Sequence, residues 1–226
     1  MCSGYTTHNM NQNIFKEPII FSIEGNIGAG KTTQLKQLLE IHPEYNYVDE
    51  PVDTWMSLKD DNEQNLLELF YKDMNRWSYT LQNCAFITRY TSLMNKVNDY
   101  KQNPSKYKSN VFITERSVLT DRYVFAEMLK DNKHLQPLEW SLYTMWFDYF
   151  IKDIKIHGLI YIQANPNLCK ERIGIRNRDG EENIQLDYLF DLQSFHDKWI
   201  DNTNIKVLKV TSDINDIPSI VNFIHS

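Results

Sequence analysis

Residues 18–33 read Pro-Ile-Ile-Phe-Ser-Ile-Glu-Gly-Asn-Ile-Gly-Ala-Gly-Lys-Thr-Thr, and this stretch decides the fold. The apolar run 19–23 predicts a buried strand, and the glycines after it lead to Lys31 and Thr32 in the spacing G-x-x-x-x-G-K-[ST]. Such a loop turns its backbone N–H groups inward and precedes the positive end of a helix, so it binds polyphosphate. An ordinary glycine turn can carry the same letters, but the helical spacing of Leu35, Leu38 and Leu39 favours a phosphate loop.

The polar groups of this loop have expected tasks. Lys31 would neutralise the β and γ phosphates, and the Thr32 hydroxyl would bind a magnesium ion, which keeps most of its water and takes few protein ligands. The residues expected to hold the phosphates are Gly25, Asn26, Ile27, Gly28, Ala29, Gly30, Lys31, Thr32 and Thr33.

Length and charge limit the class of protein. A chain of 226 residues is long enough for one well-filled α/β domain and short for two. Lysine plus arginine number 24 against 30 aspartate plus glutamate, a formal charge of −6. This acidic balance argues against nucleic acid, and against an anionic membrane surface, as the main partner.

The cysteines and the N-terminal residues bear on the compartment. Cys2, Cys84 and Cys169 are an odd, widely spaced set without C-x-x-C, which indicates neither a disulfide framework nor a zinc site. No apolar stretch approaches the roughly eighteen residues of a membrane span. The first 15 residues contain no lysine or arginine and no continuous apolar block. We therefore predict a cytoplasmic protein.

The order of elements predicts the fold class. Residues 1–16 are polar and lack periodicity, which predicts a disordered leader before a single domain at 17–226. Short apolar runs predict strands at 19–23, 45–48, 111–113, 159–163 and 207–210. Helical spacing predicts helices at 32–41, 66–74, 77–97, 118–129, 138–156, 186–199 and 217–224, with another starting at Asn165-Pro166. Strands that alternate with helices indicate an α/β fold with a five-stranded parallel sheet covered on both faces.

Charged residues follow several of these strands. Ligands of parallel sheets bind outside the carboxyl ends of the strands, so the phosphate loop, Glu50, Glu115 and Arg116 should meet at one rim. A guanine-reading Asn-Lys-x-Asp is absent, because Asn95-Lys96 is followed by Val97-Asn98, and this argues against a switch GTPase.

A group of arginines lies later in the chain. Arg172, Arg176 and Arg178 could surround a phosphate in transfer, and Gly180 could serve as the hinge of a moving lid. A solvated basic helix face is the alternative interpretation of these arginines.

Five motifs in this order resemble the deoxynucleoside kinase family, and most closely its deoxycytidine and deoxyguanosine kinase branch. They are the glycine loop from Glu24, the segments 50–55, 76–82 and 115–122, and the arginine-rich lid that continues through 186–189. The resemblance extends from about Ile19 to the C-terminus. It implies a P-loop kinase fold with an arginine-rich lid, ATP or another triphosphate as donor with Mg²⁺, a deoxynucleoside as acceptor, and a homodimer.

The resemblance also implies roles for single residues. Glu50 corresponds to the general base for the 5′-hydroxyl, Arg116 to an arginine near that hydroxyl and the incoming phosphate, and Glu115 to the carboxylate associated with magnesium. Lys31, Arg176 and Arg178 complete the implied catalytic set. The alternatives are a carboxylate that caps the next helix for Glu50 and an internal ion pair for Glu115 with Arg116.

Further positions correspond to the two substrates. The nucleobase would face Gln82, Arg89 and Asp121; the sugar 3′-hydroxyl would bind Tyr71 and Glu181; the walls of the base pocket would be Trp55, Phe70 and Phe125; and the donor's base would pack on Asp213 and Ile214, with Arg172 on its phosphates. The aromatic residues could equally be ordinary core, and Asp121 could form a surface pair with Arg122.

The chemistry of two of these side chains predicts the base preference. An ionised Asp121 only accepts hydrogen bonds and Arg89 only donates them. Cytosine, adenine and guanine carry an exocyclic amine, whereas thymine presents a carbonyl that Asp121 would repel. By resemblance, the members that accept thymidine have apolar residues at these two positions. We expect deoxycytidine and the purine deoxynucleosides to be preferred over thymidine. The sequence predicts no order of preference among deoxycytidine, deoxyadenosine and deoxyguanosine.

Two other functions compete with this one. A thymidylate kinase shares the loop, the sheet and the lid, but its acceptor is an anionic monophosphate that Glu50 would repel. A nucleotide-binding regulatory protein without catalysis is the second. The segment 138–156 has more large aromatic residues than one helix face can bury, and this favours a subunit interface.

Overall fold

The computed structural model describes residues 16–213 and 216–226. Most of the predicted leader therefore lies outside the described residues; of it only Lys16 is described, and its carbonyl accepts a hydrogen bond of 2.8 Å from the Tyr100 hydroxyl. No helix of the described residues is long and apolar enough to cross a bilayer.

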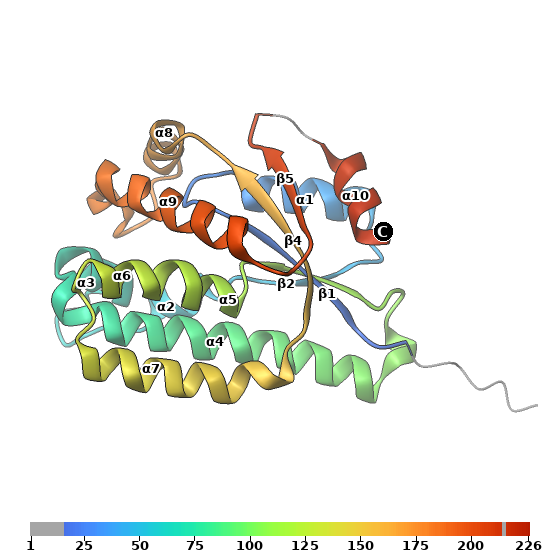
Figure 1. Ribbon diagram of the computed structural model, residues 1–226, viewed down its shortest axis with the longest axis horizontal. Helices are drawn as coiled ribbons and strands as arrows, with labels where there is room; N and C mark the ends of the chain where they lie inside the picture. The colour runs from blue at the N-terminus through green and yellow to red at the C-terminus, as the bar shows by residue number, and fades with distance from the viewer. Residues whose placement is uncertain (1–15, 214–215) are drawn as a thin grey trace, which may run out of the picture.

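Five parallel strands form one sheet in the order β2-β3-β1-β4-β5 (Figure 1). The strands are β1 Ile19–Gly25, β2 Asn46–Val48, β3 Val111–Glu115, β4 Ile156–Gln163 and β5 Val207–Thr211. β1 lies at the centre of the sheet, and its backbone pairs with β3 on one side and β4 on the other. This confirms the α/β class with a five-stranded parallel sheet, and it brings the end of β1 close to the ends of β3 and β4.

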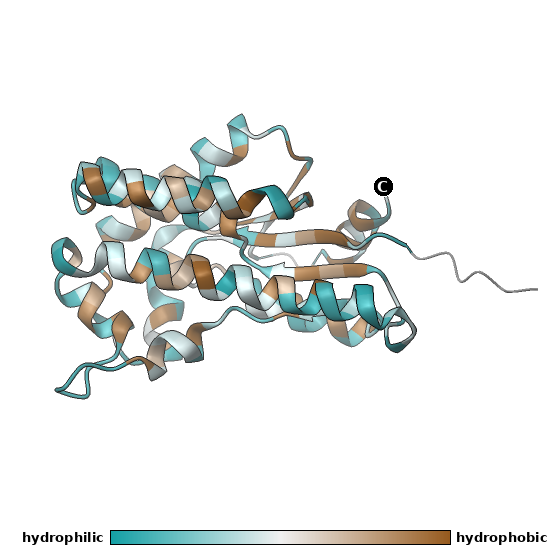
Figure 2. Ribbon diagram, turned by 90° about the horizontal axis from the view of Figure 1, so that it is seen from below, coloured by the Kyte–Doolittle hydropathy of each residue, from teal (hydrophilic) through white to brown (hydrophobic). Residues whose placement is uncertain are grey.

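Helices cover both faces of the sheet. In Figure 1, α4 and α7 lie together on one side of the sheet, and α1 and α10 lie together on the other. The helices are α1 Lys31–Ile41, α2 Val52–Ser57, α3 Leu66–Lys72, α4 Met74–Gln102, α5 Val118–Thr120, α6 Glu127–Asp131, α7 Pro137–Phe150, α8 Pro166–Arg176, α9 Leu186–Asn202 and α10 Ile217–His225. Short 3₁₀ turns lie at Pro104–Lys106, Ile151–Asp153 and Glu181–Asn183. Figure 2 shows apolar strands inside and helices that alternate between apolar and polar residues.

The core lies between these layers. Phe21, Phe112, Leu159 and Tyr161 are fully or almost fully buried on adjacent strands. Because both faces of the sheet are covered, the strands read as near-continuous apolar runs rather than as alternating ones. A well-packed sheet gives the loops at its carboxyl rim a rigid base.

One predicted helix is too long and one helix was missed. The helix predicted at 138–156 ends at Phe150, a 3₁₀ turn follows at Ile151–Asp153, and Ile156 pairs with Ile20 as the first residue of β4. Pairing with the sheet holds Ile156 extended, and the aromatic spacing of α7 does not reveal it. Helix α2 was not predicted, because its six residues are too few to show a period.

The helix predicted at 118–129 has an unexpected geometry. Between α5 and α6 the turn Asp121–Ala126, labelled η2, is π-helical. Such wide turns are rare and frequently occur at functional sites. Here the wide turn begins at Asp121, one of the residues predicted to read the nucleobase.

Candidate functional site

The phosphate loop lies at the carboxyl end of β1 and packs tightly against α8. A side chain at Gly28, where φ is +77°, would place its Cβ 2.5 Å from the Cys169 carbonyl oxygen, so only glycine fits. The Asn26 side chain fixes the loop from inside: its amide donates to the Leu189 carbonyl at 2.8 Å and its oxygen accepts from Ile27 N–H at 2.8 Å. The loop is therefore pre-formed by packing.

Lys31 is folded back onto this loop. Its ammonium donates to the carbonyl oxygens of Gly25 at 3.2 Å and Asn26 at 2.9 Å. Burial, assisted by the positive charge of Arg116, lowers the pKa of Lys31 to about 8. The ammonium is thus buried and partly destabilised, and an anion in the loop would compensate it.

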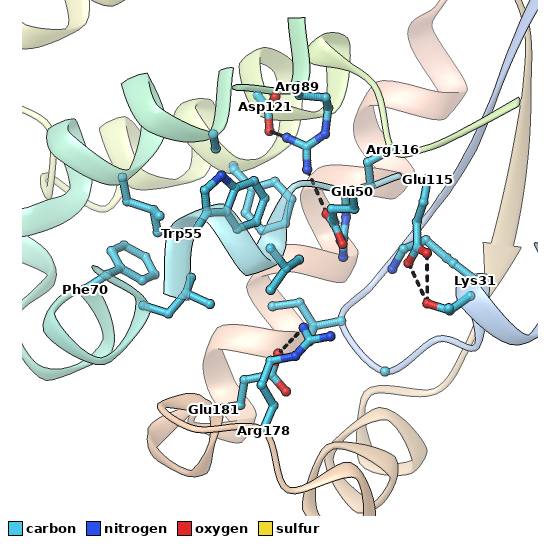
Figure 3. Close-up of a pocket in the computed structure, with 18 of the residues that line it drawn as sticks. Lys31, Glu50, Trp55, Phe70, Arg89, Glu115, Arg116, Asp121, Arg178 and Glu181 are labelled. Carbon is cyan, nitrogen blue, oxygen red and sulfur yellow. Dashed lines mark hydrogen bonds and ion pairs between the residues drawn. The ribbon is translucent and has the colours of Figure 1, made fainter. Parts of the chain in front are cut away.

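The two residues predicted to bind magnesium lie side by side. The Thr32 hydroxyl lies 2.9 and 2.8 Å from the two carboxylate oxygens of Glu115, which is itself buried and is labelled in Figure 3. Within the described residues no group of three His, Cys, Asp or Glu side chains could hold a metal alone. One hydroxyl and one carboxylate suit Mg²⁺, whose remaining ligands in such sites are phosphate and water oxygens.

Glu50 lies between two arginines at the end of β2. Its Oε1 accepts from Arg89 Nη2 and from Arg116 Nη1, both at 2.7 Å. Burial alone would raise the pKa of Glu50, but the charges of Arg116 and then Arg89 outweigh it and lower that pKa to about 2. The capping alternative for Glu50 receives no support, because no side chain caps α2.

Arg116 has an unusual backbone. Its φ is +60°, a left-handed conformation that non-glycine residues adopt rarely and at a cost. Its N–H donates to the Ile23 carbonyl at 2.9 Å, its Nη2 to the Gly25 carbonyl at 3.3 Å, and its own carbonyl accepts from the Thr114 hydroxyl at 2.6 Å. These bonds hold the guanidinium between the phosphate loop and Glu50. The predicted internal ion pair of Arg116 exists, but with Glu50 rather than with Glu115.

Arg89 also binds Asp121. Its Nη1 lies 2.5 Å from Asp121 Oδ1, and both side chains are buried. Burial raises the pKa of Asp121 to about 6 against the lowering effect of Arg89. Among the described residues Asp121 Oδ2 and Gln82 Oε1 are buried acceptors without a hydrogen-bond donor. Asp121 is therefore not the partner of Arg122, which pairs with Glu127 instead.

Aromatic residues close the pocket around this pair. The Arg89 guanidinium lies 5.3 Å from the centre of the Trp55 ring, and Trp55 Nε1 donates to the Thr88 hydroxyl at 2.9 Å. Phe125 lies under Arg116, with 5.3 Å between the guanidinium carbon and the ring centre. Phe70 is buried next to Tyr71, at 4.9 Å between ring centres.

The lid arginines are paired. Glu181 accepts from Arg176 Nε at 3.1 Å and Nη2 at 2.6 Å, and from Arg178 Nη1 at 3.0 Å. Arg178 lies beyond the end of α8, in the turn before Gly180, whose φ is +86°. Arg172 is separate from this group: it donates to the Ala29 carbonyl at 3.3 Å and lies 3.8 Å from Asp213. These partners on the lid and the loop argue against the alternative interpretation of the three arginines as a solvated basic helix face.

Two cavities meet at the loop. One, which we call the nucleoside-side cavity, is lined by every residue predicted to bind the nucleoside, from the ends of β2 and β3, from α2, α3 and α4, and from the π-helical turn and the lid. The other is lined by Thr33, Arg172 and Asp213, which are predicted to bind the phosphate donor. Both are lined by the same six residues: Gly28, Lys31, Thr32, Glu115, Arg176 and Arg178. A group bound in one cavity can therefore reach a group bound in the other across these residues.

Some site positions fall outside these predictions. Ile214 lies outside the described residues. The nucleoside-side cavity also contains residues that the sequence did not single out: Tyr47, Val52, Asp53, Leu67, Leu81, Ala85 and Tyr188. Tyr47 and Val52 flank Glu50, so the carboxyl rim could have indicated them, whereas Leu67 and Leu81 carry no signal beyond helical spacing.

Comparisons with known proteins bear on the family of this chain. The sequence profile described as deoxynucleoside kinase matches residues 21–223. The chain is 38% identical over 200 residues to the probable deoxycytidine kinase of Fowlpox virus (strain NVSL), covering 85% of this chain and 78% of the relative. It is 33% identical over 213 residues to the mitochondrial deoxyguanosine kinase of Xenopus laevis, covering 88% and 79%. It is 33% identical over 201 residues to the deoxycytidine kinase of Homo sapiens, covering 82% and 76%.

The lowered pKa of Lys31 predicts a pH dependence of triphosphate binding. Bound phosphate favours the charged ammonium, so affinity should be constant up to about pH 8 and then fall as the free protein loses this proton. The fall should approach roughly tenfold per pH unit. Calorimetric titration with ATP from pH 7.5 to 9.5 measures it. In Lys31→Arg, whose guanidinium stays charged, the dependence should vanish; a flat profile in the unmodified protein would contradict this role.

Proposed function

This chain belongs to the deoxynucleoside kinase family, and we propose that it transfers the γ-phosphate of ATP to the 5′-hydroxyl of deoxycytidine or a purine deoxynucleoside in preference to thymidine. As a member it is an ATP-dependent phosphotransferase. The observation that carries the preference is the pair of buried acceptors, Asp121 Oδ2 and Gln82 Oε1, on two residues that line the nucleoside-side cavity. We further propose that residues 17–226 act as one kinase domain.

Unpaired acceptors favour a base with an exocyclic amine. A buried acceptor without a donor costs free energy that an amine N–H would recover. With its pKa at about 6, Asp121 is mostly ionised at pH 7 and accepts rather than donates. A thymine carbonyl at the same place would leave the acceptors unpaired and bring two negative oxygens together.

The proton of the 5′-hydroxyl would pass to Glu50. With two guanidinium groups bound, the resting carboxylate is too weak a base to take a proton early in the reaction. The hydroxyl would replace one arginine bond, and the proton would move only as the phosphoryl group leaves the donor. Arg116 would then be released toward the transferred group, whose charge it stabilises.

The donor side would hold the triphosphate and its metal. The phosphate loop and Lys31 would bind the β and γ phosphates, and Thr32 with Glu115 would hold Mg²⁺. When bound, the metal neutralises phosphate charge. Arg176 and Arg178 line both cavities, so a small movement of the lid away from Glu181 would bring them to the phosphates, while Glu181 and Tyr71 would bind the sugar 3′-hydroxyl.

The two competing functions receive less support. A monophosphate acceptor would bring a dianion next to Glu50. Glu50 is itself negatively charged near pH 7, because its pKa is about 2, so the two would repel each other. A regulatory protein without catalysis would have no need of a buried carboxylate between two arginines beside the phosphate loop. The cytoplasm is the compartment we propose from the cysteine pattern; the Xenopus relative is named mitochondrial, so cell fractionation decides.

A substrate panel tests the proposed function. With ATP and magnesium, kcat/KM should be highest for deoxycytidine, deoxyadenosine or deoxyguanosine and lower for thymidine by several orders of magnitude, as for a buried polar mismatch. The panel includes one ribonucleoside and deoxycytidine 5′-monophosphate. Thymidine used as well as the others would contradict the base preference. Faster phosphorylation of the monophosphate would contradict the 5′-hydroxyl as acceptor.

Replacement of the proposed base tests the mechanism. Glu50→Gln should lower kcat by about 10² to 10⁴, because no group then accepts the hydroxyl proton, while deoxynucleoside still binds. The matched control is Asp53→Asn, which removes a carboxylate from the same cavity but outside the arginine pairs, and it should change kcat by less than about threefold. A turnover of Glu50→Gln close to the unmodified value would remove the role.

The apolar face of α7 supports a homodimer. Leu138, Met145, Trp146 and Tyr149 recur at helical spacing and are 72%, 65%, 52% and 66% exposed, so one face of α7 lacks a partner among residues 16–213 and 216–226. In Figure 1, α7 lies at the outside of the molecule beside α4. If two copies of this chain pack α7 against α7, each copy covers the exposed apolar face of the other.

Sedimentation measures this association. We expect the mass of a dimer at micromolar concentration, and a monomer for Trp146→Glu, which would bury a charge in the interface. A control substitution on another exposed helix residue, Ile175→Glu on α8, should leave the dimer intact. A monomeric mass of the unmodified chain would contradict the interface.

A further inference from the structure

A buried carboxylate lies next to the site but in neither cavity. Glu24 precedes the first glycine of the phosphate loop, and it is fully buried. Its Oε1 accepts from the Ser22 hydroxyl at 2.5 Å and from the Ser117 hydroxyl at 2.9 Å, and its Oε2 accepts from the Thr120 hydroxyl. No ion pair joins Glu24 to a basic side chain in the part of the chain that the structure describes.

Such an environment is unusual for an acid. Buried carboxylates are normally paired with a cation because burial without compensation is costly. Here three hydroxyl donors satisfy the carboxyl group from different parts of the chain. A buried polar group that loses its partner costs free energy, so these bonds hold their three donors in place.

The three hydroxyls belong to two segments, one leading into the phosphate loop and one containing Arg116, whose relative position determines the geometry of the site. Ser22 lies on β1, whereas Ser117 and Thr120 lie in the loop after β3 and the first turn of α5. Ser117 directly follows Arg116, the residue with the left-handed backbone.

The contacts of Arg116 lie on both sides of Glu24 along β1. Its N–H bonds to the carbonyl of Ile23 and its guanidinium to the carbonyl of Gly25. Glu24, the residue between them, bonds to Ser117. Three consecutive residues of β1 thus contact two consecutive residues of the loop after β3. A strained backbone persists only where its surroundings over-determine it.

We propose that Glu24 is a positioning residue that, through the Ser117 hydroxyl, holds Arg116 in its left-handed conformation at a fixed place beside the phosphate loop. The proposal rests on the proposed function in one respect, that Arg116 contacts the transferred phosphoryl group. Glu24 itself touches neither substrate, because it lines neither cavity.

A matched pair of serine substitutions tests this role. Ser22→Ala and Ser117→Ala each remove one hydroxyl from the same oxygen of Glu24, but only Ser117 belongs to the Arg116 segment. Ser117→Ala should lower kcat by about 10- to 100-fold with the KM for deoxynucleoside within about twofold, because a small misplacement of a catalytic group has effects of this size. Ser22→Ala should leave kcat within about twofold, and Ser117→Thr, which restores a hydroxyl, should recover most of the loss.

Hydrogen exchange gives a readout that does not depend on activity. The Arg116 amide should exchange about tenfold faster in Ser117→Ala than in Ser22→Ala, since the latter leaves the loop held. Equal losses of kcat in the two alanine variants, or equal exchange at Arg116, would overturn the proposal by showing that Glu24 only stabilises the fold.

Two further measurements separate the possible failures. If Ser117→Ala does not fold, Glu24→Gln replaces it: an amide has one oxygen to accept from three hydroxyls, and the same split between kcat and KM is expected. If the unmodified protein phosphorylates no deoxynucleoside, the proposed function is contradicted. The exchange rates of the Arg116 amide in the two alanine variants would still test whether Glu24 positions Arg116.

Discussion

The site depends on one interaction, the largely buried carboxylate of Glu50 held by Arg89 and Arg116. Removal of one partner from such a group leaves a buried charge without compensation, which is strongly destabilising. The three side chains come from the end of β2, from α4 and from the end of β3, so the ion pairs fix a strand, a helix and a loop relative to one another. The same bonds keep the pKa of Glu50 low until a ligand disturbs them.

The arrangement connects base recognition to phosphoryl transfer. Arg89 binds Asp121 through one nitrogen and Glu50 through the other, so the residue proposed to read the base also contacts the residue proposed to take the proton. On the other side, Lys31 and the lid arginines line both cavities. Donor and acceptor would therefore meet at these cations, of which Arg176 and Arg178 are paired with Glu181 and Lys31 would be compensated by the bound phosphate.

Much of this could be predicted from the sequence because it depends on local patterns. The glycine spacing before Lys31 predicts the loop, the apolar runs predict the strands, and the parallel topology brings Glu50 and Glu115 to one rim. The identity of the acceptor came only from the resemblance of five motifs to a family.

The remaining features depend on contacts between distant residues. Phe150 ends α7 because the next residues lead into the sheet, and aromatic spacing does not indicate this. The hydroxyls around Glu24 come from residues 2, 93 and 96 positions away, and the pairing of Glu181 with the lid arginines depends on how the lid folds back. The π-helical turn at Asp121 interrupts a segment whose apolar spacing is that of an ordinary α-helix.

The titration of Glu50 in the free protein tests the central interaction most directly. Its side-chain carboxyl resonance can be followed by NMR and assigned by its absence in Glu50→Gln. Two bound guanidinium groups predict that Glu50 stays ionised throughout the acid range in which the protein is folded, since its pKa is about 2. A protonation midpoint at or above the ordinary value of about 4.3 would show that the arginines do not hold this carboxylate as an anion, and would contradict the proposed site.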